Sequence, residues 1–311
     1  MDNNKDCVIQ LSKEDDILSP RYDGTFKSIF TMETPEAKIA LMDFISTFLD
    51  KKVTEVKLMP NEPPIENEKD KALRFDIRCK FDDNERANIE MQLHPGDNEL
   101  VRSELYLCKL HAGQPLKGKG YSEVKNTYQI TIVANETVIT EDDEFFHKFE
   151  YYDKINKVSY KGKTFPITIE LSKLKKILKK DPDLMNDKEA RAIFFKYGED
   201  IKNRDLINKI IKKERGVRMA ASTLLTISKD EMIRDKVFQE KKKKQDAVSD
   251  IRDAMLKGRA EGEVIGIRKG EARMAIQKSV EIARNLISLN LSNDKISKAT
   301  GLSIQQIEEL Q

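Results

Sequence analysis

Two short apolar segments on either side of a polar turn constrain the fold of this chain more than any other stretch. Residues 74–81 and 87–92 have the length and the composition of strands, and the polar residues 82–86 between them favour a turn. Because side chains two positions apart leave a strand on the same face, Glu90 and Gln92 share one face of the second strand. The pattern therefore predicts two adjacent strands with a polar site on one face.

The acidic residues on these two strands suit a divalent metal. Asp76 lies on the first strand between two apolar neighbours, and Glu90 lies on the second. Mg²⁺ prefers six oxygen ligands and keeps several waters, so two carboxylates and the backbone carbonyl of Met91 would make a sufficient site. A metal-bound water could then attack phosphorus while the metal stabilises the charge on the phosphate. Spacing alone leaves a second interpretation open, in which both acids are solvated residues at a strand edge.

The composition limits the classes of protein to which the chain can belong. Its 311 residues are 39% hydrophobic and 35% charged, which supports a packed core together with long solvated helices. The formal net charge of +2 gives no overall bias toward nucleic acid, so any nucleic-acid surface has to be a local patch. The three cysteines and three histidines show no zinc-type spacing.

The cysteine usage and the lack of long apolar segments favour a soluble, cytoplasmic protein. The cysteines are widely separated, which is typical of a reducing compartment. The first residues lack the basic and apolar regions of a signal peptide. No apolar stretch approaches the roughly 20 residues needed to span a bilayer, so no membrane partner is expected.

Periodicity and composition divide the chain into five regions. Strand-like and helical patterns alternate up to about residue 172, which indicates an α/β core, and lysine-rich helical sequence follows. Thr34 and Pro35 predict the start of an amphipathic helix that ends at Leu49. The five regions are a loose N-terminal arm at 1–19, a core domain at 20–172, a lysine-rich helical region at 173–250, a long helix at 251–285 and a helix-turn-helix-like segment at 286–311.

Glycine recurs at every fourth position of the expected long helix, at Gly258, Gly262, Gly266 and Gly270. This period places small residues on one slowly drifting helix face, although each glycine destabilises a lone helix by up to about 1 kcal/mol. The face belongs either to a long exposed helix or to a close contact between helices. The second alternative would make the protein a homo-oligomer through its C-terminal helices.

The last segment has the outline of a helix-turn-helix, with Ser292 and Ser303 as expected N-caps and Gly301 at the turn. The second helix carries Glu308 and Glu309, and two acids on a recognition helix would repel phosphate. Packing or oligomerisation is therefore favoured over DNA recognition by this segment.

Several motifs follow one another in a fixed order along the chain. Asp76 precedes Glu90-Met-Gln92, and other motifs accompany this pair on both sides: Tyr22–Phe30, Arg102 with Tyr106, Gln114–Tyr121 and Leu286–Ser303. Together they resemble the Rpn family of recombination-promoting nucleases, also described as PD-(D/E)xK transposase-like proteins. The central motif is similar to the variant of the PD-(D/E)xK pattern in which glutamine replaces the usual lysine. The resemblance covers most of the chain, although the lysine-rich middle carries little of it.

The resemblance implies a restriction-endonuclease-like core with a mixed sheet between helices. It also implies cleavage of DNA phosphodiesters that depends on Mg²⁺ or Mn²⁺ and is linked to recombination or transposition. Asp76 and Glu90 would be metal ligands, and Gln92 would orient the attacking water. Asp23, placed before the first core helix, would be a further acidic catalytic residue. The candidates for contact with the DNA backbone are Lys27, Arg78, Lys80, Arg102 and Tyr106.

Gln92 is neutral, so the positive charge that a lysine would provide has to come from another residue. Lys27, Arg78 and Lys80 are the candidates. Three functions remain open, and the first is favoured: a metal-dependent DNA endonuclease, a catalytically inactive relic of a mobile element that acts in interaction or oligomerisation, and a DNA-binding regulator that uses its C-terminal helices.

Overall fold

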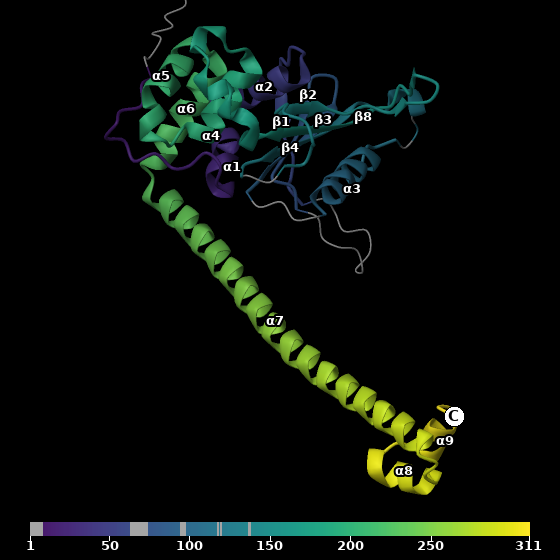
Figure 1. The fold of residues 1–311 in the computed structure, drawn as a ribbon. Coiled ribbons are helices and arrows are strands. Elements are labelled where there is room, and N and C mark those ends of the chain that lie inside the picture. The colour runs from purple at the N-terminus through teal and green to yellow at the C-terminus, as the bar shows by residue number, and fades with distance from the viewer. Residues whose placement is uncertain (1–8, 63–73, 94–97, 117, 119, 136–137) are drawn as a thin grey trace, which may run out of the picture. The chain divides into compact units, whose positions relative to one another are not determined.

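A mixed sheet flanked by helices forms the centre of the first part of the chain (Figure 1). The computed structural model describes residues 9–62, 74–93, 98–116, 118, 120–135 and 138–311. The chain divides into two compact units, Met1–Lys241 and Lys242–Gln311. The α/β class and the mixed sheet expected from the sequence are confirmed.

The main sheet has six strands in the order β1-β2-β3-β4-β8-β5. Their bounds are β1 (Val56–Leu58), β2 (Ile77–Phe81), β3 (Glu85–Gln92), β4 (Thr127–Val133), β8 (Thr164–Glu170) and β5 (Phe146–Lys148). β3, β4 and β8 are parallel, whereas β1, β2 and β5 pair antiparallel with their neighbours. A separate hairpin consists of β6 (Tyr152–Asp153) and β7 (Val158–Ser159). The sequence did not predict β5 or β6.

The predicted pair of strands forms the hairpin β2–β3. Asp82 and Asn84 in the turn adopt φ values of 40° and 64°, a left-handed conformation that Asp and Asn tolerate better than most residues. The Asp82 carboxylate also accepts hydrogen bonds from the backbone N–H groups of Thr54 and Glu55, at 2.8 and 3.2 Å. Asp76 lies directly before β2, where the sequence had placed it on the strand.

The two faces of the sheet differ in polarity because alternate side chains of a strand point to opposite faces. Helices α1 (Asp23–Thr31), α2 (Pro35–Leu49), α4 (Asp187–Tyr197), α5 (Arg204–Lys213) and α6 (Arg215–Ser228) share a large apolar core with one face. Ile77, Ile89 and Ile130 are the strand residues at its centre. The intervening residues of β3, including Asn88 and Glu90, give the other face its polar character, and α3 (Glu99–Ala112) covers part of it (Figure 1).

The start of α2 agrees with the sequence prediction. The Thr34 hydroxyl accepts a hydrogen bond from the backbone N–H of Ala37 at 3.2 Å, and Pro35 is the first helical residue. The helix ends at Leu49, and Asp50 follows in the left-handed region with φ of 53°. The N-cap, the proline at the first helical position and the spacing of the apolar residues are all local signals. This helix could therefore be predicted with its bounds.

The N-terminal arm is not loose over its described part. Residues 1–8 lie outside the described residues, but Leu11 and Ile17 are buried in the main core. The backbone N–H of Leu11 donates to Asn208 Oδ1 at 2.9 Å, and its carbonyl accepts from Asn208 Nδ2 at the same distance. Two apolar anchors and this paired hydrogen bond hold the arm against α5, a contact that sequence alone could not indicate.

The lysine-rich region after residue 172 shares the main core through α4, α5 and α6. Short 3₁₀ helices connect these elements and earlier ones: η1 (Tyr121–Glu123), η2 (Leu171–Lys175), η3 (Ile177–Lys179), η4 (Pro182–Leu184) and η5 (Ile201–Asn203). The division of the chain at residue 241 does not coincide with the boundaries expected at 172, 250 and 285. None of the helices in the described ranges has a stretch long and apolar enough to cross a bilayer.

The second unit contains most of α7 (Glu231–Ser288), followed by α8 (Asn293–Thr300) and α9 (Ile304–Glu308). Ala283, Ile296, Leu302 and Ile307 form its small core. Gly301 has φ of 73° and ends α8, and Ser303 caps α9 in a capping box with Gln306, as the sequence predicted for Ser303. A Cβ added at any of the four periodic glycines of α7 would meet no atom within 4 Å, so this face makes no close contact within the described chain.

Gly216 allows α6 to approach α2 closely. A Cβ at this position would lie 1.8 Å from the carboxylate carbon of Asp43. That carboxylate accepts hydrogen bonds from Nε and Nη2 of the buried Arg191 at 2.6 and 2.7 Å. The absence of a side chain at Gly216 therefore protects an ion pair that joins α2 to α4.

We expect Gly216→Ala to lower the free energy of unfolding by about 1–3 kcal/mol, the usual cost of overpacking. The added methyl group would displace Asp43 from Arg191, and denaturant unfolding measures the effect. Gly258→Ala is the matched control, because the new Cβ meets nothing and alanine favours a helix by up to about 1 kcal/mol. An unchanged stability of Gly216→Ala would contradict the packing of α6 on α2.

Candidate active site

The polar face of the sheet brings together residues from four elements. Asp76 lies directly before β2, Glu90 and Gln92 belong to β3, Lys27 to α1 and Arg102 to α3. All five belong to the set that the sequence predicted.

Lys27 lies between two carboxylates. Its Nζ is 2.9 Å from Asp76 Oδ1 and 2.9 Å from Asp23 Oδ2. Burial alone would lower the pKa of Lys27, but the charges and hydrogen bonds of Asp76 and Asp23 raise it above its ordinary value. The ammonium group therefore stays charged at neutral pH. Asp23 is the first residue of α1, one position inside the helix that it was expected to precede.

The Asp76 carboxylate is mostly buried, and its second oxygen accepts a hydrogen bond from the backbone N–H of Met91 at 3.4 Å. Burial raises the pKa of Asp76, the charge of Asp23 raises it further, and Lys27 opposes both effects. The Met91 side chain packs in the apolar core on the opposite face. The carbonyl of Met91 as a metal ligand stays a prediction.

Glu90 is completely buried on a central strand and is held by three neighbours. Asn88 Nδ2 donates to Glu90 Oε1 at 2.9 Å, and Gln92 Nε2 donates to Glu90 Oε2 at 3.1 Å. The guanidinium of Arg102 is 3.7 Å from Glu90 Oε2. Burial, together with the charge of Asp76, raises the pKa of Glu90 to about 7 against the opposing effect of these neighbours.

Sequence reasoning missed a further acid, Glu99, in the first turn of α3. Glu99 is buried, and its Oε2 is 3.6 Å from Arg102 Nη1, whereas Oε1 has no hydrogen-bond partner among the described residues. Burial raises the pKa of Glu99, Arg102 lowers it, and the charge of Asp76 raises it. Its position three residues before Arg102 was the signal that could have indicated it.

A chain of hydrogen bonds continues from Glu90 across the sheet. Asn88 Nδ2 also donates to Gln129 Oε1 at 2.8 Å, and Gln129 Nε2 donates to Thr131 Oγ1 at 3.4 Å. The hydroxyls of Thr131 and Ser103 are 3.0 Å apart, which carries the network to α3. These neutral polar groups satisfy one another on a face that would otherwise be costly to bury.

Two of the expected DNA contacts are not free to reach a ligand. Tyr106 is buried with its ring centroid 5.1 Å from that of Phe75, so it is a packing residue. Arg78 is buried too, with its guanidinium 5.4 Å from the centroid of Phe75 and Nη1 donating to the carbonyl of Pro60 at 3.3 Å. Arg78 therefore does not replace the missing lysine beside Asp76.

Lys80 belongs to a row of cations across three strands. The register pairs Lys57 of β1 with Lys80 of β2, and Lys80 with Arg86 of β3. Like charges directly opposite one another destabilise a sheet. Burial and then the charges of Arg86, Arg78 and Lys57 lower the pKa of Lys80. Among the described residues no carboxylate forms an ion pair with any of these four cations, so the row is a local positive patch.

Comparison with known proteins identifies the family. The chain matches the family model described as PD-(D/E)XK nuclease family transposase over residues 20–254. The chain belongs to this family. The match confirms the resemblance drawn from the order of the motifs, and α8 and α9 lie outside it. No curated protein and no solved structure matches the chain.

PD-(D/E)XK nucleases generally use divalent metals. Asp76, Glu90 and Glu99 offer hard oxygen atoms of the kind that Mg²⁺ and Mn²⁺ prefer. Burial is the main cause that raises the pKa values of all three carboxyls, and the charge of a neighbouring carboxylate raises each of them further. Within the described ranges no group of three or more His, Cys, Asp or Glu side chains is arranged to hold a metal, so backbone and water oxygens would have to complete the shell.

The raised pKa of Glu90 predicts a pH dependence of stability in EDTA. The folded state binds the Glu90 proton more tightly than the unfolded state, so its stabilising effect is complete below about pH 4.5 and is lost as the pH rises through about 7. We expect the Tm of the wild-type protein to fall relative to that of Glu90→Gln between pH 5 and pH 8. Thermal unfolding of both proteins at the two pH values measures this difference. A constant difference would contradict the burial of an ionisable carboxyl at this position.

Proposed function

We propose that this protein is a metal-dependent nuclease that hydrolyses phosphodiester bonds of DNA. The observation that carries the proposal is the contact of Lys27 with Asp76 beside the buried Glu90, within the residues that the family model matches. Lys27 supplies the charge that the glutamine at position 92 lacks. The family description adds transposition as the biological setting.

Each residue of the site has its own role in the proposed reaction. Asp76 and Glu90 would hold the metal, and a bound Mg²⁺ or Mn²⁺ would lower the pKa of a water and stabilise charge on the phosphate. Gln92 uses its amide N–H group to hold Glu90, which leaves its carbonyl oxygen to orient a water. Lys27 uses two of its three donors on Asp76 and Asp23, and the third can reach a phosphate oxygen.

The cation row explains how a polyanion would lie on this face. Arg86 and Glu90 are four positions apart on β3, which corresponds to about 13 Å of strand. Of the three cations in the row and the neighbouring Arg78, Lys57 and Lys80 are accessible, whereas Arg78 and Arg86 are buried. Phosphates on either side of the cleaved bond would relieve the repulsion among these cations.

Nicking of supercoiled plasmid tests the assignment. We expect nicking with Mg²⁺ or Mn²⁺ and none in EDTA, and at least a 100-fold loss in Asp76→Ala. Lys27→Met should lose about 100- to 1,000-fold, the usual effect of removing a group that stabilises transition-state charge. Lys38→Met, a substitution of an exposed lysine on α2, is the matched control. Equal nicking by the wild-type protein and Asp76→Ala would exclude this site.

A second proposal, self-association through α7, has its own observation. The helix exposes Val248, Ile251, Met255 and Ile265, and together with Gly258 and Gly262 these residues alternate at spacings of three and four. This is the heptad spacing of a coiled-coil seam. The seam is narrow, and a second copy of the same helix is the simplest partner for it.

Light scattering after gel filtration measures the mass directly. We expect a mass of at least twice the 35.8 kDa of one chain, and a single-chain mass for Ile251→Glu combined with Met255→Glu. Ile155→Glu, which changes an exposed isoleucine of the first unit, is the control and should keep the larger mass. A single-chain mass for the wild-type protein at high concentration would remove the proposal.

A further inference from the structure

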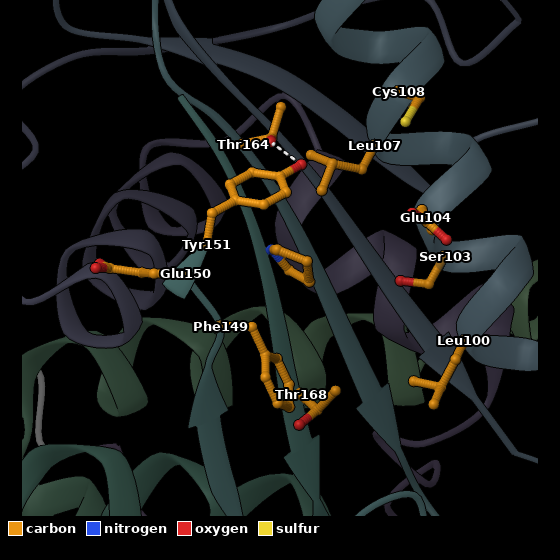
Figure 2. A pocket seen from close by; sticks show the side chains of 11 residues that line it. Leu100, Ser103, Glu104, Leu107, Cys108, Phe149, Glu150, Tyr151, Thr164 and Thr168 are labelled. Atoms are coloured by element: carbon orange, nitrogen blue, oxygen red, sulfur yellow. Dashed lines mark hydrogen bonds between the residues drawn. The ribbon is translucent and has the colours of Figure 1, made fainter. Parts of the chain in front are cut away.

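A cavity of about 310 Å³ lies beside α3, where the helix faces β8 and the segment that follows β5 (Figure 2). Its walls are mainly apolar or aromatic, from Leu100 and Leu107 on α3 and from Phe149 and Tyr151 after β5. Small-molecule sites in proteins have volumes of roughly 300–1,000 Å³. The cavity is therefore just large enough for one small planar ligand.

One hydroxyl in the wall of this cavity has no partner. Thr168 is 3% exposed, and its Oγ1 makes no hydrogen bond with any described residue. The other hydroxyls of the wall are engaged: Tyr151 with Thr164 at 2.9 Å and Ser103 with Thr131 at 3.0 Å. Buried polar groups in native proteins are almost always paired, so an unpaired hydroxyl that faces a cavity is available to a ligand with a complementary polar atom.

A second, more open cavity of about 500 Å³ adjoins the first. Both are lined by Cys108, Tyr151 and Thr164. The second cavity adds two lysines, Lys161 and Lys163, together with exposed tyrosines. The amino group of Lys163 donates to the carbonyl of Val124, which fixes its charge at this place. The combined surface is apolar with a free hydroxyl at one end and cationic at the other.

Glu104, an exposed residue of α3, is an acidic group in the lining of the apolar end, whereas the Glu150 carboxylate points away from the other lining side chains (Figure 2). A ligand suited to this surface has a planar ring that carries N–H donors and an anionic group several ångströms away. Nucleotides have this chemistry: the base would stack against Tyr151 and Phe149, and the phosphate would lie near Lys161 and Lys163.

We propose that this surface binds a nucleotide, either free or as an unpaired residue of a nucleic-acid strand. The site is distinct from the carboxylates around Asp76, and binding does not rest on nuclease activity. It is nevertheless connected to them, because Ser103 in its wall is the last member of the hydrogen-bond chain that begins at Glu90.

Calorimetric titration in EDTA tests the proposal with defined probes. These are the four deoxynucleoside monophosphates, the corresponding nucleosides and a ten-residue single-stranded oligonucleotide. Thr168→Val removes the hydroxyl at nearly constant shape, and it should not unfold the protein because that hydroxyl has no partner to lose. Lys161→Gln removes one charge, and Lys154→Gln removes a charge from an exposed lysine that lines neither cavity.

We expect at least one monophosphate or the oligonucleotide to bind. Thr168→Val should weaken the binding of nucleotide and nucleoside alike by about 2- to 10-fold, the effect of one hydrogen bond. Lys161→Gln should weaken the nucleotide but not the nucleoside, and Lys154→Gln should change neither. Binding by Asp76→Ala should equal that of the wild-type protein, which separates this site from the proposed nuclease centre.

The probes also distinguish the two sources of the ligand. A monophosphate that binds as tightly as the oligonucleotide identifies a free nucleotide, and binding of the oligonucleotide alone identifies an unpaired residue of a strand. The absence of binding by every probe at millimolar concentration would overturn the proposal. Binding that neither Thr168→Val nor Lys161→Gln weakens would overturn it as well, because the ligand would then occupy another place.

Discussion

The burial of Glu90 in the middle of the sheet is the constraint on which the rest of the site depends. An ionised carboxylate without compensation is very unfavourable in a protein interior. Asn88 and Gln92 can reach it only because they are two positions away on the same strand and face. Arg102 approaches Glu90 from α3, so the position of that helix over the polar face also helps to compensate the charge of Glu90. Asn88, Arg102 and Gln92 all lower the pKa of Glu90, so without them burial would raise it further.

The helices after residue 172 contribute to the site through α1. Phe26 and Phe30 of α1 each pack with ring centroids 5.7 Å from that of Phe195 on α4. Lys27 follows Phe26, about 100° further round the helix axis, and its amino group contacts Asp76. The aromatic contacts therefore fix the rotation of α1 about its axis. Lysine-rich sequence that looked like a separate region supports the geometry of the proposed catalytic lysine.

Much of this arrangement follows from local sequence signals. The hairpin around residues 82–86, the shared face of Glu90 and Gln92, and the capped start of α2 all depend on spacings of a few residues, and the structure confirms them. The contacts that the sequence could not provide join distant segments. Which of three cations approaches Asp76 depends on how α1 docks on the sheet, and the cation row depends on strand register. β5 is three residues long and has no alternation of apolar residues, so the sequence contains no pattern that predicts a strand at this place.

The glutamine at position 92 changes the charge balance of the site, and the position of Lys27 explains how the motif can tolerate it. A lysine on β3 would add its charge next to Glu90, whereas Lys27 places the charge between Asp76 and Asp23, which is itself acidic. Four carboxylates, Asp23, Asp76, Glu90 and Glu99, then face only two cations, Lys27 and Arg102. With all four carboxylates ionised the site would lack two positive charges, which one bound divalent cation would supply. Burial raises the pKa values of Asp76, Glu90 and Glu99, and a cation bound among these carboxylates would favour their charged forms.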